Sequence, residues 1–379
     1  MMNDSNPFVY SSLWKALSES QKPDRPEFSG TLLKRAGISS NQLKELELGR
    51  RSFTIDQLLM VASGFRIDAQ SLVIAYLNEK MKVLSDSKQS DQQIEQVAEN
   101  LKYFKSISFD ASIDYPDGLL KRFIKSIVFY EGSRTVRNHE IMLPDGVIQL
   151  IIALDDHERI CVNGNNNSIR HLNKTVVMGA QTRYRKFLIP PDEKTLTIRF
   201  KPGGFYSMTG IPASEITDSF IPAYQIFGPT FNDLRNDLKT IEKPHDCFKK
   251  LKQYLIKRCR KTGVSVKNGL NILSNISLKP VHQLAEESGI SHKHLIHISK
   301  KYLGLSPKSY QRVLRFSKIL NEINSLNSSP EWADIVYHFD YYDQPHLINE
   351  FREFSGFSPQ SYIETGNTCS KYLHINFKR

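Results

Sequence analysis

The sequence has few cysteines, and they show no metal-ligand spacing with one another or with histidines. No CxxC pair occurs, and His139, His157 and His171 stand far apart in the chain. Isolated cysteines are typical of small buried side chains in a reducing compartment rather than of disulfides or a zinc site. We therefore expect no metal and no other cofactor. The four cysteines are Cys161, Cys247, Cys259 and Cys369.

Long apolar runs are also absent. The longest, around residues 146–154, is far too short to cross a bilayer. The first residues lack the basic start and apolar centre of a signal peptide. We expect a cytoplasmic protein with no membrane partner.

Basic residues outnumber acidic ones. The chain of 379 residues holds 51 Lys and Arg against 40 Asp and Glu, a formal net charge of +11. This surplus favours an acidic partner such as nucleic acid, although it says nothing about the fold. A chain of this length exceeds one ordinary hydrophobic core, so several domains are expected.

The spacing of apolar residues changes along the chain and predicts a multidomain α+β protein. Helical spacing predicts an all-α module over residues 1–80, and residues 81–106 are polar enough for a linker or a solvated helix. Seven short β-branched and aromatic runs separated by turn sequences predict a β-rich central domain with a helical end over residues 107–262. We expect a sandwich or small barrel there. Residues 263–365 have helical spacing, and residues 366–379 form a tail.

The C-terminal part contains two similar pairs of short helices. In the first unit (residues 277–311), Gly289 stops a short apolar helix and Ser291 is placed to cap the next one. The inner face of that second helix carries Leu295, Ile298 and Tyr302. A short helix, a tight turn and an amphipathic helix make up the helix-turn-helix plan.

The second unit (residues 329–362) repeats this plan. Asp343 takes the capping position, and Leu347, Phe351 and Phe354 form the inner face. Both units close with the same pattern, GLSPKSY at residues 304–310 and GFSPQSY at residues 356–362. One helix is predicted to connect the units, so we predict an all-α C-terminal domain with a double helix-turn-helix.

The stretch YYDQPHLINEFREFSGFSPQSY resembles the signature of the DNA-binding domain of the AraC/XylS family of bacterial transcription regulators. The resemblance implies two recognition helices that enter successive major-groove segments on one DNA face. It implies base contacts by Lys293, Ile296 and His297 in the first unit and by Gln344, Pro345, Ile348 and Asn349 in the second. Phosphate contacts are expected from Ser291, His292, Lys300, Lys301, Arg312 and Arg315.

Charge differs between the two units. Residues 291–318 contain seven Lys and Arg and no acid, whereas residues 331–364 contain one Arg and seven acids. Because phosphate neutralisation dominates affinity for DNA, the first unit is expected to supply most of the binding.

The N-terminal module is a second candidate for DNA binding. Its GIS sequence at residues 37–39 and ELGRR at residues 47–51 resemble the Cro/CI-type helix-turn-helix. The resemblance implies side chains that face the groove and a phosphate contact. A helical interaction or dimerisation module without DNA contacts is the alternative. The implied residues are Ser40, Asn41, Gln42 and Lys44 toward the groove and Arg50 or Arg51 toward the phosphates.

The sequence therefore predicts a sequence-specific transcription regulator that binds double-stranded DNA and is not an enzyme. The resemblance to the AraC/XylS family implies that the central domain senses a small-molecule effector or forms a homodimer, and RNA polymerase is a further candidate partner. A DNA-repair alkyltransferase would need a reactive cysteine in a Pro-Cys-His-like setting, which the sequence lacks. A helical and β interaction scaffold without specific DNA binding remains the alternative.

Overall fold

The computed structural model describes most of the chain from residue 52 onward. The described residues are 52–65, 68–86, 94, 97, 98, 100, 101, 108–133, 138–163, 168–259, 264–276, 278–325 and 330–364. The six residues of the N-terminal candidate site, from Ser40 to Arg51, lie outside them.

Two N-terminal helices, α4 (Ile55–Phe65) and α5 (Ala69–Asp86), pack on the first strands of the central domain. A reciprocal cap starts α4, since Thr54 N–H donates to Gln57 Oε1 at 2.9 Å and Gln57 N–H donates to Thr54 Oγ1 at 3.3 Å. Leu58 and Val73 share a buried cluster with Phe109 and Val128 of the sheet. The helices therefore form a second buried cluster with the first two strands of the central domain, apart from the main core, and α5 extends past residue 80, where the sequence pattern ends the N-terminal module.

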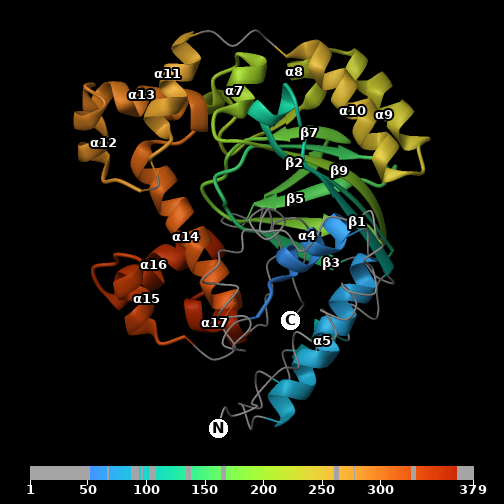
Figure 1. Ribbon diagram of the computed structural model, residues 1–379, viewed down its shortest axis with the longest axis horizontal. Helices are drawn as coiled ribbons and strands as arrows, with labels where there is room; N and C mark the ends of the chain where they lie inside the picture. The colour runs from blue at the N-terminus through green and yellow to red at the C-terminus, as the bar shows by residue number, and fades with distance from the viewer. Residues whose placement is uncertain are drawn as a thin grey trace.

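The central domain is a sandwich of two antiparallel sheets (Figure 1). One sheet has the order β1-β2-β9-β4-β7-β10, and the other has the order β3-β8-β5-β6. A small buried cluster of Met142, Cys161, Met178 and Phe220 lies apart from the main core, with contacts from both sheets. The strands are β1 (Ser108–Asp114), β2 (Ile124–Ser133), β3 (Asn138–Met142), β4 (Gln149–Ala153), β5 (Arg159–Asn163), β6 (Ile169–Leu172), β7 (Thr175–Met178), β8 (Arg185–Ile189), β9 (Asp192–Phe200) and β10 (Phe220–Pro222).

Several helices between the strands and after β10 pack against the sandwich. The amphipathic helices α9 and α10 contribute Phe231, Leu238 and Leu251 to the main core. Arg235 of α9 donates to the carbonyl oxygens of Ala153 and Asp155 at the end of β4, at 2.7 and 2.6 Å. These elements are η1 (Leu120–Arg122), α7 (Gly204–Thr209), η2 (Ala213–Glu215), α8 (Ala223–Phe227), α9 (Thr230–Lys239) and α10 (Pro244–Arg258).

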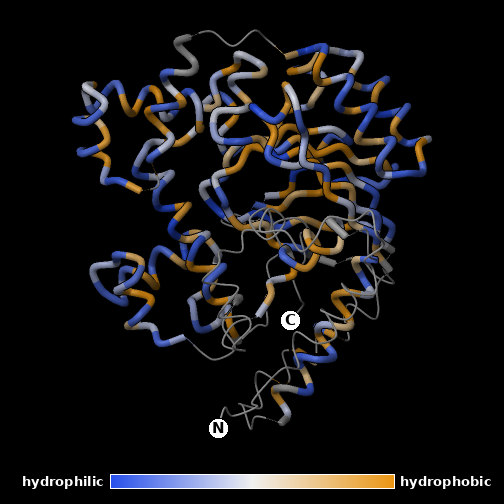
Figure 2. Tube along the Cα trace, in the orientation of Figure 1, coloured by the Kyte–Doolittle hydropathy of each residue, from blue (hydrophilic) through white to orange (hydrophobic). Residues whose placement is uncertain are grey.

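The C-terminal domain is all-α, and Figure 1 shows it as two helical groups joined by the long helix α14. Figure 2 shows the apolar segments concentrated in the sandwich, while polar segments alternate with apolar ones along the C-terminal helices. None of the helices that the structure describes combines the length and apolar composition that crossing a bilayer requires. The C-terminal helices are α11 (Val264–Leu273), α12 (Val281–Glu287), α13 (His292–Leu303), α14 (Pro307–Ser325), α15 (Trp332–His338), α16 (Gln344–Ser355) and α17 (Pro359–Glu364).

Candidate nucleic-acid interface

The two units turn between their helices in the same way. In the first unit Gly289 has φ +62° and Ile290 N–H donates to the carbonyl oxygen of Ala285 at 3.1 Å. In the second unit Asp340 has φ +54°, and Tyr341 N–H donates to the carbonyl oxygen of Val336 at 3.0 Å. Aspartate is one of the few residues besides glycine that tolerate left-handed backbone, so the second turn forms without a glycine.

Both second helices begin at the predicted caps. Ser291 Oγ accepts a hydrogen bond from His294 N–H at 3.2 Å, and Asp343 Oδ1 accepts one from His346 N–H at 2.8 Å. Pro345 occupies the first turn of α16, where a missing N–H costs nothing. The predicted capping roles of Ser291 and Asp343 are confirmed.

Both second helices also end alike, in the Gly-x-Ser-Pro pattern. Gly304 (φ +86°) and Gly356 (φ +79°) each adopt left-handed backbone. Their N–H groups donate to the carbonyl oxygens of Lys300 and Arg352 at 3.0 and 2.9 Å. A left-handed glycine is the usual way to end a helix sharply. The repeated pattern therefore fixes where the second helix of each unit ends.

Helix α13 buries one face and leaves the predicted base-contact face open. Leu295, Ile298 and Tyr302 are buried. The opposite face brings together the predicted contacts, with Ile296 half-buried at its edge. The exposed members are Ser291, His292, Lys293, His297 and Lys300.

Helix α16 is arranged in the same way. Leu347, Phe351 and Phe354 are buried, and the ring of Phe316 on α14 lies 5.2 Å from that of Phe351. Aromatic pairs at this separation stabilise a core beyond the area that they bury. The predicted contacts share the outer face: Gln344, Pro345 and Asn349 are exposed, and Ile348 is half-buried.

Lys301 and the two arginines have partners within the chain. Lys301 Nζ lies 4.9 Å from the ring centroid of Tyr206 on α7, and a hydrogen bond with Tyr206 raises the pKa of Lys301. Arg312 and Arg315 of α14 form ion pairs with Glu350 of α16. Phosphate contact by these three residues stays a prediction.

Glu350 is a buried carboxylate that sequence reasoning did not single out. Its side chain is 1% exposed. Burial alone raises the pKa of Glu350, but hydrogen bonds from Tyr341, Arg312 and Arg315 outweigh it and hold the pKa below its usual value. Glu350 follows Ile298 by 52 residues, the interval that also separates Gly304 from Gly356. Aligning the two units would have shown a charged residue at a core position.

The β domain contacts the C-terminal ends of both α13 and α16. Thr217 Oγ1 donates to the carbonyl oxygen of Gly304 at 2.8 Å. A Cβ atom on Gly356 would lie 2.7 Å from Cζ of Tyr184, so this ring also packs closely on the second unit. The two contact loops are joined by Asp218, which accepts from Thr182 N–H at 2.8 Å. One surface of the β domain therefore contacts both units.

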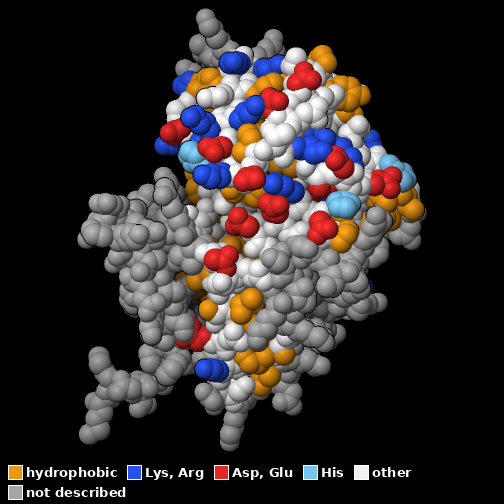
Figure 3. Space-filling view, turned by 90° about the vertical axis from the view of Figure 1, so that its right-hand side faces the viewer, with side chains coloured by type: hydrophobic (Ala, Val, Ile, Leu, Met, Phe, Trp, Pro, Cys, Tyr) orange, Lys and Arg blue, Asp and Glu red, His pale blue; other side chains and the backbone are white. Residues whose placement is uncertain are grey.

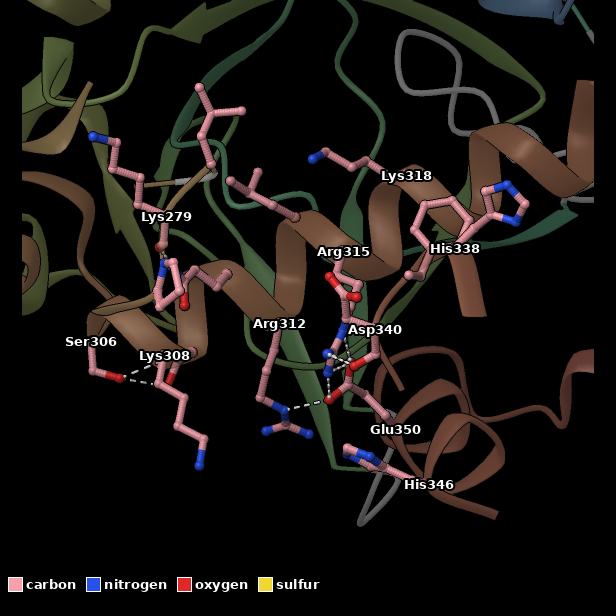
Figure 4. Close-up of a pocket in the computed structure, with 16 residues that line it drawn as sticks. Lys279, Ser306, Lys308, Arg312, Arg315, Lys318, His338, Asp340, His346 and Glu350 are labelled. Carbon is pink, nitrogen blue, oxygen red and sulfur yellow. Dashed lines mark hydrogen bonds and ion pairs between the residues drawn. The ribbon is translucent and has the colours of Figure 1, made fainter. Parts of the chain in front are cut away.

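A groove of about 740 Å³ lies along α14 between the two units (Figure 4). Lys308 and Lys318 are exposed and point away from Glu350, whereas Arg312 and Arg315 point toward it. Figure 3 shows another face of the molecule, on which Lys, Arg, Asp and Glu side chains are intermixed. A face of mixed charge attracts nucleic acid less than a basic one does.

Two family models match the chain. Residues 284–365 match the family described as a helix-turn-helix domain, and residues 115–222 match a domain of unknown function, DUF6597. The second match runs from the end of β1 to β10. The chain matches no curated protein.

Several solved structures share low similarity with the chain. ToxT from Vibrio cholerae has 9% identity and a TM-score of 0.32, covering 68% of this chain and 98% of its own. An HTH_3 family transcriptional regulator from Vibrio cholerae has 15% identity and a TM-score of 0.20, covering 52% and 97%. The AraC-like transcriptional activator CuxR has 12% identity and a TM-score of 0.25, covering 57% and 88%. Likeness at this level adds nothing to the geometry.

The family match and the repeated turns, caps and buried faces agree on the same residues. Residues 284–365 of this chain therefore form a helix-turn-helix domain of the AraC type, the DNA-binding domain of a class of transcription regulators.

Proposed function

We propose that the chain regulates transcription by placing α13 and α16 in successive major-groove segments on one face of double-stranded DNA. The observation that carries this proposal is the repetition of one geometry in a single domain. Each unit has a capped, amphipathic second helix with a buried apolar face and an exposed polar face. The major groove is wide enough to admit such a helix.

The exposed side chains give the two helices different chemistry toward bases. Lys293 can donate to guanine acceptors, and Gln344 and Asn349 can each pair bidentately with adenine. Ile296, Pro345 and Ile348 offer apolar contact, for example to a thymine methyl group, and His297 adds a polar contact. Ser291, His292 and Lys300 are the phosphate contacts at the first unit, and they fix position without reading sequence.

Control by the central domain is part of this proposal. Thr217 and Tyr184 reach both units from one surface, so a change in the sandwich can alter both recognition helices together. A cavity of about 60 Å³ between the sheets is lined by apolar side chains including Ile151 and Phe187, with Arg159 and Lys174 among its polar residues. Ligand pockets usually measure ~300–1,000 Å³, so a small-molecule effector at this place would have to widen the space between the sheets. Homodimerisation and contact with RNA polymerase are the other routes of control.

Selection of DNA from a random library, followed by binding titrations over a salt series, tests the DNA-binding proposal. Lys300→Ala should lower the slope of log affinity against log salt by about 0.9, the value for one lost phosphate contact. Lys249→Ala is the matched control, since Lys249 is exposed on α10 of the central domain. Its slope should equal that of the unmodified protein.

Three outcomes count against the proposal. Selection of no sequence would favour the interaction scaffold without specific DNA binding. An equal loss of slope in the Lys300 and Lys249 variants would show general charge attraction instead of a defined interface. Full binding without any dependence on Lys300 would move the DNA site away from α13, with the N-terminal residues Ser40 to Arg51 as the next candidates.

A further inference from the structure

A carboxylate sits where the second unit should have an apolar residue. Glu350 lies on the inner face of α16, and its counterpart in the first unit, Ile298, packs in the core. Burial of a carboxylate is unfavourable unless its charge is paired and its oxygen atoms accept hydrogen bonds. The partners of Glu350 are therefore part of the structure of this unit.

Those partners come from two other elements. Arg312 Nε donates to Glu350 Oε2 at 2.7 Å, and Arg315 Nη2 donates to both carboxylate oxygens at 2.8 and 2.9 Å. The Tyr341 hydroxyl donates to Oε1 at 2.6 Å. Both arginines lie on α14, while Tyr341 lies in the turn before α16. The cluster thus joins the connecting helix to the second recognition helix and to its turn.

Arg315 holds the turn as well as the helix. Its guanidinium lies 4.0 Å from the ring centroid of Tyr341, and its Nη1 donates to the carbonyl oxygen of Asp340 at 3.4 Å. Asp340 is the residue with left-handed backbone in this turn. A planar group with five donors can satisfy several acceptors in one geometry, which a lysine cannot do.

We propose that Glu350 is a positioning residue that, through Arg312 and Arg315, fixes the angle between the connecting helix and the second recognition helix. Because α14 also carries the first unit, this angle sets the distance between the two recognition helices. This positioning role serves the proposed DNA-binding function and rests on it. It assigns the two arginines to Glu350, and hence away from DNA phosphates.

The reason is the position of the carboxylate. If either arginine turned to a phosphate, Glu350 would remain buried with part of its charge uncompensated, which is strongly unfavourable. Lys308 and Lys318 do not pair with Glu350, so turning toward a phosphate would leave no buried charge uncompensated. Both are exposed basic residues on the same helix, so they remain available to the DNA backbone.

The distance between the recognition helices can be measured in the free protein with paired spin labels. Labels at Lys293→Cys and Asn349→Cys, with Cys259 and Cys369 replaced by serine, report on exposed positions of α13 and α16. Glu350→Gln should broaden or shift the distance distribution. Glu353→Gln is the matched control, because Glu353 lies three residues after Glu350 on α16. Its side chain is 39% exposed, and among the described residues it forms an ion pair only with Arg312.

Arg315→Lys separates positioning from charge. It keeps a positive charge for a phosphate but loses the two-pronged contact with Glu350, so it should broaden the distribution as Glu350→Gln does. In the salt series, Arg315→Ala should weaken binding to the selected DNA and leave the slope unchanged. A phosphate contact would instead lower the slope by about 0.9. Lys300→Ala supplies the reference for a lower slope.

The outcomes of the two measurements are separable. Circular dichroism checks that the Glu350→Gln and Arg315→Lys variants are folded. If both are folded and both keep the distance distribution of the unmodified protein, the positioning role is wrong, whatever the DNA results. A lower slope for Arg315→Ala would also overturn it. If the unmodified protein selects no DNA but its distribution broadens in both variants, the positioning role stands and the proposed function fails.

Discussion

The contact between the first unit and the β domain can be measured through Gly304. A Cβ atom here would lie 2.7 Å from Thr217 Oγ1 and 3.1 Å from the carbonyl oxygen of Ala213, at a φ of +86°. Left-handed backbone costs an L-residue about 1–2 kcal/mol. Gly304→Ala should cost more than this, because the new Cβ atom must either displace Thr217 or move α13 away from the loop after η2.

Gly289 provides the matched control. It also has left-handed backbone (φ +62°), but no atom beyond its two chain neighbours lies within 4 Å of the position of its Cβ. Gly289→Ala should therefore cost the backbone strain alone, about 1–2 kcal/mol. Gly304→Ala should cost roughly 1 kcal/mol more, the usual worth of a hydrogen bond such as that from Thr217 to the Gly304 carbonyl.

Urea unfolding followed by circular dichroism gives the two free energies of unfolding. The same pair of variants is then made with Thr217→Ala, which removes the oxygen closest to the new Cβ atom. The extra cost of Gly304→Ala should shrink in that background, because only the contact with Ala213 remains. Equal costs at both glycines, with and without Thr217, would refute close packing of α13 against the β domain.

Two further predictions concern the caps and the response to acid. Ser291→Ala and Asp343→Ala should each lower the free energy of unfolding by about 1 kcal/mol. The loss should be larger at Asp343, because its hydrogen bond is shorter and charge-assisted. A larger loss at Ser291, measured by urea unfolding, would contradict this order. The folded-state pKa of Glu350 lies below its usual value of 4.5, so its contribution to stability is complete above pH 4.5 and is lost as the pH falls through that lowered pKa. Thermal unfolding from pH 6 to pH 3 should therefore depend less on pH in Glu350→Gln, and parallel curves for the two proteins would contradict the lowered pKa.

Much of the C-terminal domain could be predicted because its signals are local. A cap such as Ser291 or Asp343 acts on backbone groups three residues away, and a glycine such as Gly304 acts within its own turn. These features can be predicted from the sequence without knowing what packs against the helix. The same reasoning identified which face of α13 and α16 is buried, since 3.6-residue periodicity reports burial directly.

The central domain shows where local signals weaken. All seven predicted runs form strands, but β1, β6 and β10 were not among them. Strand β1 (SFDASID) is rich in Asp and Ser, residues depleted in strands, and is held by pairing with β2 and packing against α4 and α5. Strand β10 has three residues and ends in Pro222, which is tolerated because β10 is an edge strand. Tertiary partners, invisible in the sequence, decide these elements.

Tertiary ion pairs also reduce, without reversing, the charge difference between the two units that the sequence shows. Arg312 and Arg315 were counted as positive charge near the first unit, and Glu350 and Glu353 as negative charge of the second. The structure pairs these arginines of α14 with these glutamates of α16, so the paired charges offset one another. The deficit of positive charge at the second unit is therefore smaller than the sequence implies, and so is the excess at the first. In the proposed complex, Gln344 and Asn349 would therefore meet less electrostatic repulsion from DNA than the sequence alone implies.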